Sequence, residues 1–195
     1  MSKIKTAQQI ANELAAPFTV IGLDGRIYPA HKWKVQTAKG LCVPYIDARQ
    51  AQQRLNDILG VDGWGNTFIE TNGDGLICEI TALIEGKEVR KSNVGTRTSI
   101  EAEKGQASDA IKRAATAFGV GTYLYDMQPV QVKMSGKFPV DEKGNILSTG
   151  DELSSFINLK NPLMAKLFEI WNSLNETQKK SLQNDFSNIK KALEE

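Results

Sequence analysis

The sequence predicts an α+β fold: a helix, a three-stranded antiparallel meander and a second helix, followed by a small C-terminal αα-hairpin. Two observations carry this prediction. Apolar residues change from helical to extended spacing at Trp64 and return to helical spacing from Ile100. Turn residues typical of hairpins, at 72–75 and 85–87, divide the extended stretch into three segments. We therefore expect helices packed on one face of an antiparallel sheet.

Two helices and a basic strand are predicted before the meander. The first helix has Thr6 as its candidate N-cap and ends before Pro17. Residues 31–36 are typical of a short strand that carries basic side chains. The second helix begins after Asp47, a suitable N-cap, and ends at Gly60. Its apolar face consists of Ala48, Ala51, Leu55 and Ile58.

The meander and the helix after it form the expected centre of the fold. The three strands cover residues 64–71, 76–85 and 87–95. Residues 100–118 form a long helix, which Gly119 ends. The apolar face of this helix consists of Ala107, Ala110, Ile111, Ala114, Ala117 and Phe118.

Composition divides the chain into a core domain at 1–128, a linker at 129–150 and a helical hairpin at 151–195. The linker has little periodicity and several turn residues. The hairpin has balanced charge and two amphipathic stripes, the second of them capped near Asn175 or Thr177. The stripes consist of Leu163, Leu167, Trp171 and Leu174, and of Leu182, Phe186, Ile189 and Leu193.

The composition excludes several classes of protein. Lys and Arg total 24 and Asp and Glu 23 among 195 residues, so a net charge of +1 excludes a polybasic tail and an acidic solvating chain. Two separate cysteines, Cys42 and Cys78, and one histidine, His31, exclude a disulfide scaffold and argue against a zinc site or a histidine-centred triad. No apolar run approaches the roughly 18 residues of a membrane span, and residues 1–10 lack the apolar core of a signal peptide. We expect a cytoplasmic protein.

Cofactors are not expected. Gly136-Lys137 lacks the upstream glycine of a Walker A loop, and Gly119–Gly121 is too short for a dinucleotide fingerprint. A metal-dependent nuclease would need several carboxylates that converge on one ion, whereas the acids here are spread over turns and strands or share a helix with bases. The sequence therefore predicts no cofactor, no metal and no catalytic residue.

Basic residues are concentrated between Lys87 and Arg113, where seven bases stand against four acids. On the long helix a polar stripe recurs every four residues. The stripe consists of Lys104, Ser108, Lys112 and Thr116, with Arg113 beside it. Two interpretations are open: a solvated helix face on which Asp109 bridges the bases, or a groove that follows the phosphates of a nucleic acid.

Aromatic residues near the basic ones are candidates for stacking on bases. Trp33 lies between two lysines, and Tyr45 lies close to Arg49. Both a core role and a stacking role are open for these two. Trp64, between two glycines at the entrance of a strand, is expected in the core.

Three segments together resemble a known family. They are Tyr45-Ile46-Asp47-Ala48-Arg49 with Leu55 and Gly63-Trp64, then Asn93-Val94-Gly95, and finally residues 99–115 followed by 118–125. The last pair includes Lys104-Gly105-Gln106-Ala107-Ser108-Asp109-Ala110 and Lys112-Arg113-Ala114-Ala115. This combination resembles the single-strand annealing domain of the Rad52 family, in its phage (Sak-like) and bacterial (DdrA-like) branch. The resemblance covers roughly Pro17 to Tyr125.

The resemblance implies the single-strand annealing fold and a protein, not an enzyme, that binds single-stranded DNA and anneals complementary strands without ATP. It further implies a large homo-oligomeric ring that acts in homologous recombination and DNA repair, in the cytoplasm of a bacterium or a phage-infected host. By position Lys112-Arg113 match the pair that contacts the DNA backbone, Tyr45 matches a tyrosine in the groove, and Lys34 is a looser match. Thr116 stands where the eukaryotic branch has a further arginine.

The resemblance and the charge pattern together give the candidate DNA-binding residues. These are Lys112, Arg113, Lys104, Tyr45, Lys34, Arg49, Arg97, Lys32 and Trp33. The expected partners are single-stranded DNA and further copies of the chain, and a single-strand-binding protein is a candidate partner of the C-terminal hairpin.

Three other functions stay open. The order helix, three strands, helix also describes a double-stranded RNA-binding module, although such a module usually has its lysines at the start of the last helix. A coat that protects DNA ends would bind strands without annealing them. A metal-dependent nuclease would shorten DNA when magnesium is added.

Overall fold

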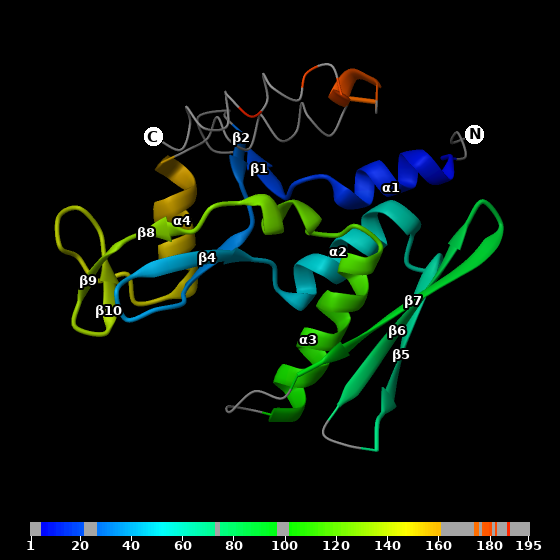
Figure 1. The fold of residues 1–195 in the computed structure, drawn as a ribbon, viewed down its shortest axis with the longest axis horizontal. Coiled ribbons are helices and arrows are strands. Elements are labelled where there is room, and N and C mark those ends of the chain that lie inside the picture. The colour runs from blue at the N-terminus through cyan, green and yellow to red at the C-terminus, as the bar shows by residue number, and fades with distance from the viewer. Residues whose placement is uncertain are drawn as a thin grey trace. The chain divides into compact units, whose positions relative to one another are not determined.

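The computed structural model describes residues 5–21, 27–72, 75–96 and 102–160, and beyond them residues 174, 175, 177–180, 182 and 187 (Figure 1). The chain forms two compact units, and each unit is built from two separate parts of the sequence. Unit 1 contains Met1–Ala15 and Ile46–Thr122, and unit 2 contains Ala16–Tyr45 and Tyr123–Glu195.

Unit 1 is an antiparallel sheet that helices cover on one face. Its elements are α1 (Ala7–Ala15), α2 (Ala48–Leu59), β5 (Trp64–Glu70), β6 (Leu76–Ile84), β7 (Lys87–Gly95) and α3 (Ala102–Ala117). The strands pair in the order β5-β6-β7, and α3 packs on β6 and β7 (Figure 1). The α+β class is therefore confirmed, and these helices and strands begin and end close to the predicted residues.

Buried and less buried side chains alternate along β6, and the buried ones show which face of the sheet the helices cover. Cys78, Ile80 and Ala82 are buried on the side of α3. Trp64 pairs with Ala82 and so points to the same face, where its Nε1 donates to Asn56 Oδ1 of α2 at 2.8 Å. Both α2 and α3 therefore cover one face, and no helix in the described part of unit 1 lies on the other face of the sheet.

The predicted helix caps are confirmed. Thr6 Oγ1 accepts from the backbone N–H of Gln9 at 3.2 Å, and Gln9 Oε1 accepts from the N–H of Thr6 at 2.8 Å. Asp47 and Gln50 repeat this reciprocal arrangement at the start of α2, with distances of 2.8 and 3.1 Å. Each cap satisfies backbone donors that a helix start otherwise leaves without a partner.

The backbone of α3 approaches the sheet closely at Gly95. A Cβ at this position would lie 2.3 Å from the carbonyl oxygen of Gln106 and 2.7 Å from the backbone nitrogen of Ala110, so only glycine fits. The buried side of α3 consists of Ala110, Ile111, Ala114 and Ala115. Ala117, predicted on the apolar face, is exposed instead, at the last residue of the helix.

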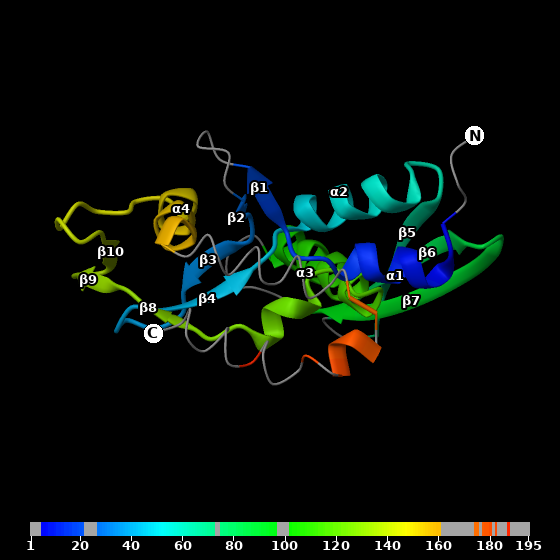
Figure 2. The same cartoon turned by 90° about the horizontal axis from the view of Figure 1, so that it is seen from above.

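Unit 2 contains short strands and a helix that packs on them. Its elements are β1 (Thr19–Ile21), β2 (Ile27–Pro29), β3 (Lys32–Val35), β4 (Leu41–Tyr45), β8 (Val130–Gln131), β9 (Lys133–Ser135), β10 (Phe138–Val140) and α4 (Gly150–Lys160), and the 3-10 helix Thr122–Asp126 leads into it. The strands pair as β1-β2, β3-β4-β8 and β9-β10. Helix α4 packs on β3 (Figure 2). The core consists of Trp33, Cys42, Val132, Leu153 and Ile157.

The segment 129–150 differs from the predicted linker, because it contains β8, β9 and β10. These strands have two or three residues each, too few for a period to be recognised in the sequence. Gly136, at φ +61°, makes the turn between β9 and β10. A division of the chain at 128 and 150 stays a prediction.

The predicted C-terminal hairpin is described only in small part. Asn175 and Gln178 each donate a backbone N–H to the other's side chain at 2.9 Å, and residues 177–180 are helical, so the cap expected near Asn175 is confirmed. Of the two stripes, Leu163, Leu167, Trp171, Phe186, Ile189 and Leu193 lie outside the described residues. Helix α4 lies before the first stripe and was not predicted.

Candidate nucleic-acid interface

The predicted basic stripe lies on the part of α3 that does not face the sheet. Lys104 and Arg113 are exposed, and Lys112 is half-buried. The amphipathic pattern of the helix explains this orientation, since Ala110, Ile111, Ala114 and Ala115 form its buried side.

Asp109 contacts both cations of the Lys112-Arg113 pair. Its Oδ2 accepts from Arg113 Nε at 2.8 Å, and its Oδ1 lies 3.8 Å from Lys112 Nζ. Oδ2 also lies 3.2 Å from the backbone nitrogen of Thr96, directly after β7. The bridge proposed for a solvated helix face is therefore present, and it also ties α3 to the end of β7.

Asp109 carries a negative charge beside the Lys112-Arg113 pair. Burial raises the pKa of its carboxyl, but the hydrogen bonds from Arg113 and Thr96 and the nearby positive charges outweigh burial, and the net pKa is lowered. Asp109 is thus ionised at neutral pH. Its single negative charge offsets one of the two positive charges of Lys112 and Arg113. An anion that approaches this face competes with Asp109 for Lys112 and Arg113.

The other bases of unit 1 have separate positions. Arg49 is exposed in the first turn of α2. Lys91 donates to the carbonyl oxygen of Ala117 at 2.6 Å and lies 5.0 Å from the centroid of the Phe118 ring, so it caps the C-terminal end of α3. Arg97 lies outside the described residues.

Lys34 and Tyr45 form the second group of predicted residues, in unit 2. The register pairs Lys34 with Val43 and Lys32 with Tyr45, so all four side chains share the face of the sheet opposite the core. Lys34 Nζ lies 5.7 Å from the centroid of the Tyr45 ring. Lys32 forms an ion pair with Asp151 at 3.2 Å. The structure thus brings the predicted residues together in two groups, one within each unit.

Trp33 is not available for stacking, and this prediction is wrong. The side chain is 3% exposed in the core of unit 2. Its Nε1 donates to Asn158 Oδ1 at 2.7 Å, and its backbone nitrogen donates to Ser154 Oγ at 2.9 Å. The indole therefore anchors α4 to β3.

A buried polar group lies beside this tryptophan. His31 is 3% exposed, its Nδ1 lies 3.4 Å from the hydroxyl of Tyr123, and its Nε2 has no hydrogen-bond partner within the described residues. Burial lowers the pKa of His31 from 6.5 to about 4. The only histidine of the sequence is therefore neutral at physiological pH and serves the core of unit 2.

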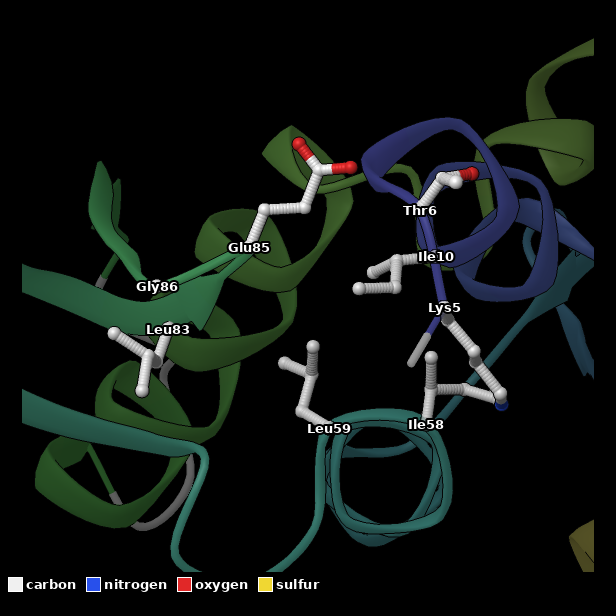
Figure 3. Close-up of a pocket in the computed structure, with 8 residues that line it drawn as sticks. All are labelled: Lys5, Thr6, Ile10, Ile58, Leu59, Leu83, Glu85 and Gly86. Carbon is white, nitrogen blue, oxygen red and sulfur yellow. The ribbon is translucent and has the colours of Figure 1, made fainter. Parts of the chain in front are cut away.

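Unit 1 also contains a pocket of about 610 Å³ between α1, α2 and the β6–β7 turn (Figure 3). Ile10, Ile58 and Leu59 supply its apolar lining, and Glu85 at its rim accepts from the N–H of Ala7 at 2.9 Å. None of the predicted DNA-binding residues lines it. Over the ranges that the structure describes, there is neither a helix long and apolar enough to span a membrane nor a cluster of three metal-ligating side chains.

Comparison with known proteins places this architecture in a family. The family described as "Rad52/22 family double-strand break repair protein" matches residues 8–82 and 74–141, which is most of the chain and includes the whole sheet of unit 1 and the β9–β10 hairpin. The chain belongs to the Rad52/22 family. The match begins before Pro17 and ends after Tyr125, the bounds of the sequence resemblance.

Two curated relatives are single-stranded DNA-binding proteins named DdrA. The protein of Deinococcus radiodurans is 32% identical over 109 residues, which cover 51% of this chain and 51% of the relative. The protein of Deinococcus deserti is 32% identical over 111 residues, which cover 51% of this chain and 53% of the relative. The chain spans about half the length of the curated relatives it matches.

Proposed function

We propose that this protein binds single-stranded DNA and anneals complementary strands during recombination and repair, without a nucleotide cofactor. The observation that carries the proposal is the position of Lys112-Arg113: the pair lies on the unburied side of α3, in a chain of the Rad52/22 family. The names of the two relatives support the choice of single-stranded DNA.

Phosphate neutralisation is the chemistry that these cations would supply. Two strands repel each other through their phosphates, and lysine and arginine lower this repulsion while they hold one strand extended. Contacts to phosphate carry no base information, so binding would be independent of sequence. Annealing forms no covalent bond, and the base pairs supply the driving force. The proposed function therefore requires no catalytic residue.

A closed homo-oligomer would multiply a weak contact in each subunit. The chain has a net charge of only +1, and Asp109 offsets one cation of the pair. Many such surfaces acting on one strand bind far more tightly than one, because each further contact is intramolecular. The outer edges of β5 and β7 have no partner strand within the described residues, and pairing with a neighbouring subunit would protect them. These edges support a ring, and we propose that it acts in the cytoplasm of a bacterial or phage-infected cell.

A coat that binds strands without annealing them is a second candidate. The names of the DdrA relatives refer to binding of single-stranded DNA and not to annealing, and this observation favours a coat. Binding and annealing must therefore be measured separately.

The test is annealing of two complementary oligonucleotides with a fluorophore and a quencher, without nucleotide, next to anisotropy measurements on one strand. We expect fast annealing, loss of at least about tenfold in affinity for Lys112→Ala/Arg113→Ala, and a salt slope smaller by about 1.4, since each phosphate contact contributes about 0.7. Lys87→Ala/Arg90→Ala removes two charges from the same unit and is the matched control. Binding without annealing would indicate the coat, preference for duplex RNA would indicate an RNA-binding module, and shortening of DNA with magnesium would indicate a nuclease.

A further inference from the structure

The β9–β10 hairpin presents an exposed aromatic ring beside lysines. Phe138 is 52% exposed, and Lys133 and Lys137 are exposed as well. The register pairs Phe138 with Ser135 and Val140 with Lys133, so Phe138 and Lys133 share one face of the hairpin. Lys137 lies in the turn itself. The opposite face, with Met134, packs toward the core of unit 2.

The positive charges of the hairpin are not balanced by acidic residues in the same segment. No acidic residue occurs between Pro129 and Val140. Among the residues that the structure describes, no ion pair involves Lys133, Lys137 or Lys39, whereas Lys32 in the same unit pairs with Asp151. The next acid, Asp141, accepts hydrogen bonds from the residues of its own loop. The lysines of the hairpin are therefore available to an anionic partner.

The turn between β3 and β4 fixes a further lysine next to the hairpin. The N–H of Val132 donates to the carbonyl oxygen of Gly40 at 3.0 Å, and the side-chain amide of Gln131 donates to the backbone carbonyl oxygen of Lys39. A Cβ on Gly40 would lie 2.2 Å from the carbonyl oxygen of Val132, so the two segments are in backbone contact. Lys39 is exposed at this junction.

The hairpin extends the face that carries Lys34 and Tyr45. Leu41 pairs with Gln131, so β8 continues the same face of the sheet toward the hairpin. Figure 1 shows β9 and β10 beside β4 and β8, within unit 2. One surface thus carries a tyrosine at one end, lysines along it and Phe138 at the other end.

We propose that this surface, the hairpin strip formed by Lys39, Lys133, Lys137 and Phe138, binds an extended single strand of DNA that also contacts Lys34 and Tyr45. The lysines would hold phosphates, and Phe138 would stack on an unpaired base. Stacking on a flat exposed ring requires a base outside a duplex, and this requirement selects single strands. The proposal rests on the proposed function and adds a contact surface in unit 2 to the one on α3.

The test measures anisotropy of a fluorescent oligo-dT strand on the full chain at several salt concentrations. Phe138→Ala should lower affinity by about 5- to 150-fold with an unchanged salt slope, because a stacking contact releases no counterions. Lys133→Ala/Lys137→Ala should reduce the slope by about 1.4. Ile146→Ala and Lys143→Ala are the matched controls, since Ile146 is 54% exposed and Lys143 is exposed in the loop after β10.

The outcomes separate this proposal from the proposed function. If the unmodified protein does not bind the strand, the proposed function fails. If it binds and the hairpin variants bind as the controls do, only the hairpin strip is refuted. Light scattering measures the oligomeric state of each variant. If Phe138→Ala lowers the oligomeric state, the hairpin strip is a contact between copies of the chain and the proposal is overturned. A bromouracil-substituted strand should crosslink to residues 133–138, and crosslinks confined to α3 would also overturn it.

Discussion

Acid should destabilise unit 2 through one buried histidine. His31 is 3% exposed beside Tyr123 and Trp33, and burial lowers its pKa from 6.5 to about 4. In the unfolded chain the same imidazole takes up a proton near pH 6.5. Because the unfolded state binds this proton first, the stabilisation is complete above pH 6.5 and is lost as the pH falls toward 4.

The size of the effect follows from the two pKa values. The difference between 6.5 and about 4 corresponds to about 3.4 kcal/mol of unfolding free energy, of which about 2.5 kcal/mol is already lost at pH 4.5. Urea unfolding followed by tryptophan fluorescence measures it. Replacement of Trp64 and Trp171 by Phe leaves Trp33, whose ring centroid lies 5.4 Å from that of His31, as the reporter of unit 2.

His31→Phe is the decisive variant, since it keeps a ring and removes the titrating nitrogens. At pH 7.5 it should be less stable than the parent by about 1 kcal/mol, because the hydrogen bond with Tyr123 is lost. At pH 4.5 it should be the more stable of the two. Carboxylates contribute equally to both proteins and cancel in the difference. Stability curves that stay parallel from pH 7.5 to 4.5 would refute the argument.

Three further perturbations test other parts of the structure. Gly95→Ala should lower the free energy of unfolding by about 2–3 kcal/mol, because the added Cβ would meet the backbone of α3. Gly65→Ala is the control and should be nearly neutral, since no atom lies within 4 Å of its added Cβ. Equal urea midpoints for the two variants would contradict this. Asp109→Asn should raise affinity for single-stranded DNA severalfold at low salt, because Lys112 and Arg113 lose their competing carboxylate, and it should cost about 1 kcal/mol of stability. Unchanged affinity by anisotropy would show that these ion pairs do not compete with phosphate. A chain that ends at Lys160 should keep unit 2 folded, whereas one that ends at Gly150 should lose it, because α4 covers the core; circular dichroism and near-ultraviolet spectra that match for both would contradict this.

Local signals in the sequence predicted the elements that local interactions stabilise. The caps at Thr6 and Asp47 use side chains three residues apart, and the turn at Glu85-Gly86 uses two positive φ values. The bridge from Asp109 to the bases of α3 likewise follows from helical spacing. The third contact of Asp109, with Thr96, depends on the approach of β7 to α3, and the spacing of residues along the helix does not predict it.

Unit 2 was harder to predict because distant parts of the chain form it. The indole of Trp33 donates a hydrogen bond to Asn158, which lies 125 residues later in the sequence. The pattern Lys-Trp-Lys-Val gives one face to lysines and the other to apolar side chains, but it does not say what covers the apolar face. The strands β8–β10 have two or three residues each, too few for periodicity, so the sequence alone predicts a linker at Phe138.

The anchoring of Trp33 by α4 also sets the order in which a ribosome can complete the molecule. Unit 1 has all of its residues once Thr122 has emerged, whereas Trp33 and Cys42 wait for Leu153 and Asn158. At the usual rate of synthesis, about 5–20 residues per second, that delay is about 2–7 s. During it the apolar side of β3 and β4 lacks its own helix, so the nascent chain has a window in which a chaperone, or β3 and β4 of a neighbouring nascent chain, competes with α4.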